Sequence, residues 1–135
     1  TCFQMTTMYS IIESEEWCES IGVEFHIRFL EGPQMHSVNS LSDAEKISLI
    51  EYYKQYVNTS KKANMIIKHL ENHIGPNFGS SKEVTRFIQF MNYLDTTRNT
   101  NWKSKFPEVC SLVEKYNPTD VFTINNPGLG GHMQD

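Results

Sequence analysis

The first thirty residues alternate between two hydrophobic patterns, and this alternation constrains the fold more than any other feature of the chain. Residues 1–9 (TCFQMTTMY) are rich in β-branched and aromatic side chains, which is typical of a short strand. Residues 10–22 predict a helix, because Ser10 can cap it and Glu13 completes a capping box. Residues 23–30 (VEFHIRFL) alternate apolar and polar side chains, which predicts a second strand.

The order strand, helix, strand predicts a parallel pair joined by a right-handed crossover. Two parallel strands make a marginal sheet, so helices must cover the pair or strands from elsewhere must complete it. The chain is therefore expected to begin as a β-α-β unit, partial and barrel-like. The residues expected to face its core are Ile11, Ile12, Cys18, Ile21, Val23, Phe25, Ile27 and Phe29.

From residue 41 onward the pattern is helical. Apolar side chains recur at helical spacing in residues 41–57, 60–75 and 80–98, and Pro107 suits the first turn of a fourth helix. Capping boxes are expected for Ser42 with Glu45 and for Ser80 with Glu83. The core-facing stripes are expected to hold Ile47, Ile50, Tyr53 or its neighbour, Val57, Ala63, Ile66, Ile67, Leu70, Ile74, Val84, Phe87, Ile88, Met91 and Leu94. The fold class is then α/β and helix-dominated, with four helices after the β-α-β start.

The chain divides into one domain and a tail. At 135 residues it can bury a real core, and residues 1–116 are expected to form a single α/β domain. Residues 117–135 are dense in Asn, Pro and Gly, which predicts an irregular tail. Within this tail, VFTI (121–124) could dock as a short extended segment.

The charge and the cysteine content indicate which classes of partner and which cellular compartment to expect. Sixteen acids and twelve bases give a formal charge of −4 without long runs, so we expect no direct nucleic-acid partner. No apolar stretch approaches the roughly 20 residues that span a bilayer, so we expect no membrane partner. Cys2, Cys18 and Cys110 are too far apart for a disulfide framework or a zinc knuckle. These features predict a cytoplasmic, reducing location.

Three histidines are candidates for chemistry. His69 and His73 are four residues apart, so on a helix both imidazoles face one side and could share a metal. No third ligand is placed by the sequence, and the helix dipole also favours a histidine pair at this end, so an ordinary surface pair is the alternative. His36 follows the second predicted strand, where ligands of parallel sheets bind.

Residues 94–116 (LDTTRNTNWKSKFPEVCSLVEKY) join two helices. Asp95 and Arg98 are one turn apart at the end of a helix, a spacing that permits an ion pair. A polar break follows, and then Trp102 and Phe106 supply apolar anchors. We predict a structural joint in which one of these rings is buried and Asp95 pairs with Arg98 or with a backbone N–H. The alternative is a ligand site.

Together these signals resemble the C-terminal part of a radical S-adenosylmethionine (SAM) protein of the twitch type. The matching stretches, within residues 1–116, are TCFQMTTMYSIIESEEWCESIG, VEFHIRFLEGP, LSDAEK and above all LDTTRNTNWKSKFPE. Ser42 stands where the family more often has proline. The resemblance implies a substrate side formed by Thr6, Tyr9, His36 and Asn39, which we assign by strand-end position and not by motif.

The resemblance also implies a [4Fe–4S] cluster and SAM in the parent enzyme. The family holds its cluster in a C-x3-C-x2-C loop, which the three cysteines of this chain cannot form. We therefore expect a C-terminal fragment or truncated relative that closes the partial barrel and covers the substrate side. It would have no catalytic residue of its own, and its partner would be the upstream barrel segment. The alternative is a small non-enzymatic interaction or assembly protein that pairs its strand edge with another chain.

Overall fold

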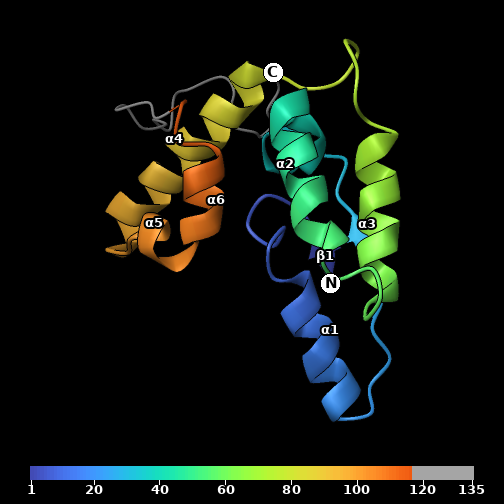
Figure 1. The fold of residues 1–135 in the computed structure, drawn as a ribbon. Coiled ribbons are helices and arrows are strands. Elements are labelled where there is room, and N and C mark those ends of the chain that lie inside the picture. The colour runs from blue at the N-terminus through green and yellow to red at the C-terminus, as the bar shows by residue number, and fades with distance from the viewer. Residues whose placement is uncertain (117–135) are drawn as a thin grey trace.

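The computed structural model describes residues 1–116, so the predicted tail and its VFTI segment lie outside the described residues. Helices dominate this part of the chain, and a short parallel strand pair lies near its start, so the helix-dominated α/β class is confirmed (Figure 1). The elements are β1 (Cys2–Phe3), α1 (Ile11–Ser20), β2 (Arg28–Phe29), the 3₁₀ turns η1 (Gln34–His36) and η2 (Val38–Ser40), α2 (Asp43–Lys54), α3 (Lys61–Glu71), α4 (Ser81–Arg98), α5 (Trp102–Lys105) and α6 (Pro107–Leu112).

The predicted β-α-β start is present but is much smaller than expected. β1 and β2 pair in parallel, with Cys2 opposite Arg28 and Phe3 opposite Phe29, and α1 is the crossover. Each strand has two residues, so the strands expected over residues 1–9 and 23–30 are wrong in length. Two such strands do not make a barrel wall, and the described residues give the barrel-like interpretation no support. Five helices follow the unit within residues 1–116, because the joint between α4 and α6 forms the short helix α5.

A turn ends β1 early. The Thr7 hydroxyl donates a hydrogen bond to the Cys2 carbonyl and accepts one from the Gln4 N–H at 3.0 Å. The Met5 N–H donates to the His36 carbonyl at 2.9 Å instead of continuing the ladder with β2. Thr7 is β-branched, a residue type that favours strands, but here its hydroxyl closes a turn.

The predicted capping box forms at helix α2 but not at helix α1. Ser42 forms the predicted capping box at α2: its N–H donates to the Glu45 carboxylate at 3.0 Å, and the Glu45 N–H donates to the Ser42 hydroxyl at 3.2 Å. Ser10 does not cap α1, because its hydroxyl donates to the Thr7 carbonyl at 3.1 Å. The box predicted at Ser10 is therefore wrong.

Helix α4 has half of its predicted box and a well-defined end. The Ser80 hydroxyl accepts from the Glu83 N–H at 3.3 Å, which is one of the two bonds of a capping box. The Ser80 N–H donates to the Ser40 carbonyl at 2.8 Å and not to the Glu83 side chain, so the second bond does not form. At the other end Asn99 takes a left-handed conformation (φ 53°), which asparagine tolerates better than most residues and which stops the helix.

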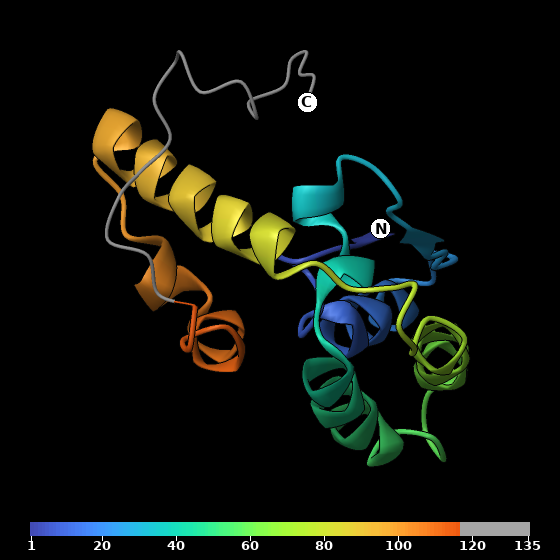
Figure 2. The same ribbon diagram turned by 90° about the horizontal axis from the view of Figure 1, so that it is seen from above.

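One hydrophobic core joins the strand pair to the helices. Phe3 is 1% exposed and packs against the ring of Tyr53 on α2 at 6.2 Å between centroids. α2 and α3 lie side by side, and Figure 2 shows α4 extending away from them toward α5 and α6. Ile47, expected in the core, is 50% exposed, because α2 turns Leu49 and the stem of Lys46 inward instead.

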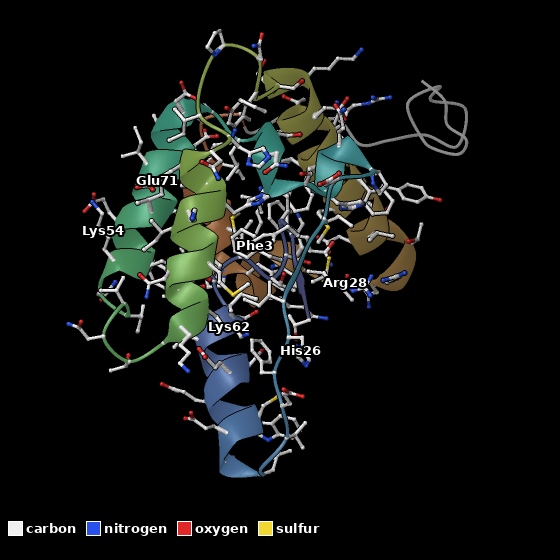
Figure 3. The ribbon with its side chains drawn as sticks, turned by 90° about the vertical axis from the view of Figure 1, so that its right-hand side faces the viewer. Phe3, His26, Arg28, Lys54, Lys62 and Glu71 are labelled. Atoms are coloured by element: carbon white, nitrogen blue, oxygen red, sulfur yellow. The ribbon has the colours of Figure 1, made fainter. Side chains whose placement is uncertain are left out.

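Helix α1 projects from the rest of the molecule, and residues 21–28 run back beside it (Figures 1 and 3). His26 and Arg28 are exposed and lie along this returning segment in Figure 3, while Phe3 lies among the interior side chains. Ile21 and Val23 were expected in the core and are 51% and 52% exposed. The expected alternation holds only from residue 25 onward, where Phe25, Ile27 and Phe29 are half-buried. The free end of α1 is therefore an apolar surface.

Among the described helices, none has both the length and the apolar character needed to cross a lipid bilayer.

Candidate functional site

A pocket of about 620 Å³ lies between the segment after β1, helices α1 and α2, and the joint of α5 with α6. Its lining includes hydroxyl, phenol and carboxylate groups, and its volume falls in the range of about 300 to 1,000 Å³ that is usual for small-molecule sites. The chain supplies the lining from three places far apart in sequence: Thr6, Thr7, Tyr9, Ser10, Ile12, Glu13 and Glu16; Tyr52 and Tyr56; and Lys105, Phe106, Glu108 and Val109.

The segment after β1 is held in place by burial and by one tyrosine. Met5 and Met8 are fully buried, so the neighbouring Thr6 and Tyr9 are left to face the pocket. The hydroxyl of Tyr53, itself buried in α2, donates to the Met8 carbonyl. Burial raises the pKa of Tyr53, which therefore keeps its proton and this hydrogen bond.

Three tyrosines form one wall of the pocket. The rings of Tyr9 and Tyr52 lie 4.9 Å apart at 78°, and those of Tyr52 and Tyr56 lie 5.5 Å apart at 58°. Burial, followed by the neighbouring Tyr56, raises the pKa of Tyr52 to about 12. Burial, followed by the Glu108 carboxylate, also raises the pKa of Tyr9. At neutral pH both phenols are uncharged, so they offer aromatic rings and hydroxyl groups but no base.

The charged side chains of the pocket are mostly acidic. Glu13 and Glu16 come from one face of α1, Glu108 from the first turn of α6, and Lys105 from the end of α5. Three carboxylates thus face one ammonium group around the same hollow. The pocket carries a negative formal charge.

The four predicted substrate-side residues do not meet. Thr6 and Tyr9 line the pocket. His36 is half-buried with its ring edge-on to Phe87 and Phe90 of α4, at 6.0 and 5.2 Å, and burial lowers its pKa. The His36 carbonyl accepts from the Met5 N–H, next to Thr6, but the His36 ring turns toward α4 and does not line the pocket.

Asn39 lies instead with the two histidines of α3. His69 Nε2 is 2.9 Å from Asn39 Oδ1, and His73 Nδ1 is 2.7 Å from the His69 carbonyl oxygen. The ring of His69 stacks on Phe29 at 4.0 Å and 6°, and the rings of the two histidines are 4.2 Å apart. Burial, followed by His73 and Lys46, lowers the pKa of His69 to about 4. Within residues 1–116 no group of three or more His, Cys, Asp or Glu side chains is arranged around a common metal position.

The joint residues divide between core and pocket. Trp102 is 3% exposed, and its indole N–H donates to the Asn92 side chain at 2.9 Å. Asp95 accepts from the Trp102 backbone N–H at 2.9 Å, while Arg98 is exposed and makes no ion pair within the described part of the chain. Phe106 is half-buried and lines the pocket. The same short stretch therefore anchors α5 and contributes to the site.

Sequence reasoning missed the tyrosines of α2 and the acid of α6. Tyr52 and Tyr56 are four residues apart in EYYKQY, a helical spacing that places two rings on one face. That signal was available, but the sequence does not say that this face meets Tyr9 and Glu108. The neighbours come together only through the packing of α2 against the N-terminal segment.

The chain matches no protein-family model, no curated protein and no solved structure.

Proposed function

We propose that this chain is the C-terminal, substrate-side portion of a radical SAM enzyme, or a truncated relative of that portion, and that it does not cleave SAM by itself. The observation that supports this role is the position of Thr6 and Tyr9. Both follow the carboxyl end of β1, where ligands of parallel α/β proteins bind, and both line the 620 Å³ pocket.

The open edge of the strand pair also supports the proposal. The backbone N–H groups of residues 24–27 donate no hydrogen bond within the described residues, although this segment leads directly into β2. Parallel strands are stable when further strands and helices cover them. An upstream barrel segment would supply such strands and is the expected partner.

The cluster of the parent enzyme does not fit this chain. Cys2 lies on β1, Cys18 on α1 and Cys110 on α6, and all three are half-buried free thiols. They do not form the closely spaced loop of thiolates that a [4Fe–4S] cluster needs. The cluster and SAM would therefore be held by the upstream segment, and no catalytic residue is assigned to this chain.

The experiment is to determine the in-frame sequence upstream of Thr1 and to produce the extended protein anaerobically. We expect a C-x3-C-x2-C loop within the preceding barrel, iron and sulfide in the purified protein, and release of 5′-deoxyadenosine from SAM when dithionite is supplied as the one-electron reductant. Replacing the three loop cysteines with alanine is the matched control and should abolish both cluster and cleavage. An upstream barrel's length of sequence without such a loop would refute the proposal.

A second candidate function is a non-enzymatic assembly protein. Trp17, Ile21 and Val23 are exposed apolar side chains at the end of α1 and just after it. Such surfaces mark contact sites on soluble proteins. Mass photometry of the purified chain tests this alternative: a stable oligomer that dissociates when the three residues are changed to serine favours it, and a well-folded monomer counts against it.

A further inference from the structure

We infer that the pocket between α1, α2 and α6 binds an organic ammonium group. The pocket is lined by the rings of Tyr9, Tyr52 and Tyr56 and by the carboxylates of three glutamates. This inference stands on the pocket itself and does not depend on whether the chain belongs with a radical SAM enzyme.

The tyrosine wall supplies three aromatic rings to one pocket, the residue type from which aromatic cages for ammonium groups are built. The ring of Tyr52 stands at 78° to that of Tyr9 and at 58° to that of Tyr56, so the three rings form a corner and not a flat stack. A cation held near such rings is attracted to the negative potential of their faces. Because Tyr52 and Tyr9 are uncharged phenols at neutral pH, their rings serve this role without titrating.

The carboxylates select the sign of the ligand's charge. Glu108 lines the same pocket as Tyr9 and Tyr52, so a cation held in this pocket would have a carboxylate near it as well as the rings. Glu13 and Glu16 add to the negative potential, and Lys105 is the one cation that opposes them among the lining residues. An anionic ligand would be repelled.

The size and the ligand set favour an organic cation over a bare metal ion. Hard cations such as calcium need six to eight oxygen ligands at about 2.3 to 2.6 Å. Within residues 1–116 no three potential metal-ligating side chains converge on one position. The pocket volume of about 620 Å³ and the three aromatic rings instead suit an alkylated ammonium group with an apolar surface.

The test is titration of the full chain with choline and with its uncharged isostere 3,3-dimethyl-1-butanol, followed by NMR chemical shifts of the tyrosine rings. We expect saturable binding of choline and an affinity at least about tenfold lower for the alcohol, because the alcohol keeps the shape and loses the charge. Equal affinity for the two compounds, or no saturable binding of choline, would overturn the inference.

Variants of pocket residues test whether choline binds in this pocket. Tyr52→Phe keeps an aromatic ring and should bind choline within about threefold of the parent chain, whereas Tyr52→Leu should bind at least about tenfold more weakly. Glu108→Gln should weaken binding, and Glu114→Gln, which changes an exposed acid outside the pocket lining, is its matched control. Because Glu108 is exposed, its variant should fold even if Tyr52→Leu does not. Unchanged binding in Glu108→Gln would exclude this pocket.

The same titration separates two sources of the ammonium group. A peptide with a trimethyllysine and the matching peptide with an acetyllysine are compared with choline. Tighter binding of the trimethyllysine peptide than of choline identifies a side chain of a protein as the ligand. Tighter binding of choline identifies a free small molecule.

Discussion

The two tryptophans of this chain lie in opposite surroundings. Trp102, at the joint of α4 and α5, is 3% exposed, and both its indole N–H and its backbone N–H have hydrogen-bond acceptors. Trp17, near the end of α1, is 63% exposed, and Ile21 and Val23, which follow it in the chain, are 51% and 52% exposed. The joint is complete within the chain, whereas the projecting end of α1 presents apolar surface to the solvent.

This difference distinguishes a region whose packing stabilises the fold from a region whose apolar side chains lie in solvent. Around Trp102 the ring of Phe87 supplies a packing contact, and the carboxylate of Asp95 supplies a polar contact. Around Trp17 the neighbours on α1 are mainly glutamates, and the backbone N–H groups of residues 24–27 donate no hydrogen bond within residues 1–116. We expect changes at the first region to affect stability and changes at the second to affect association.

The largest effect is expected from Trp102→Ala. Removing a fully buried indole should lower the free energy of unfolding by about 3 to 5 kcal/mol, because a cavity remains in the core. The matched control, Trp17→Ala, should change it by less than about 0.5 kcal/mol, since the side chain is already in water. Urea unfolding followed by circular dichroism measures both. A similar loss for the two variants would contradict the comparison.

A smaller effect is expected at Asp95. Its carboxylate accepts from the Trp102 backbone N–H at 2.9 Å and from the Thr100 hydroxyl at 2.9 Å. Asp95→Ala should cost about 1 to 3 kcal/mol, because the partly buried N–H at the start of α5 loses its acceptor. Arg98→Ala, one turn away and exposed, should cost under about 1 kcal/mol. Thermal melts that rank Arg98→Ala as the more damaging change would show that the joint depends on charge.

The smallest effect is expected from the titration of His69, which ties β2 to α3 through its stack on Phe29. Its pKa is lowered from 6.5 to about 4 by burial and by the nearby His73 and Lys46. The unfolded chain therefore binds a proton at this residue below about pH 6.5, and the folded chain does not until about pH 4. Stability is full above the unfolded pKa and falls as the pH decreases through this window, by about 1 to 2 kcal/mol after allowance for partial exposure.

Urea unfolding at several pH values measures this slope. His69→Gln removes the titrating group, so the loss of stability on acidification should become smaller. His36, whose pKa is also lowered by burial, should continue to contribute in the same direction. An identical slope in His69→Gln and the parent chain would show that the pKa of His69 is not lowered by folding.

Local signals in the sequence located most of the helices and one cap completely. Ser42 and Glu45 form the box that their spacing predicts, since both partners belong to the same turn of helix. Ser10 and Glu13 have the same spacing and form no box, because the preceding turn engages the Ser10 hydroxyl. Likewise Ile47 follows helical periodicity yet is exposed, because burial depends on which face of α2 meets α3.

The sequence by itself determined the helix-dominated class, the strand, helix, strand order at the start and the anchoring character of Trp102, because each depends on residues close together in the chain. Only the tertiary structure decided how short the strands are, that the His36 ring packs on α4 and does not line the pocket, and that Tyr52 and Glu108 join Tyr9 around it. Periodicity reports which face of an element is apolar, but it carries no information about which distant element covers that face. The pocket is made of contacts between elements that are distant in the sequence.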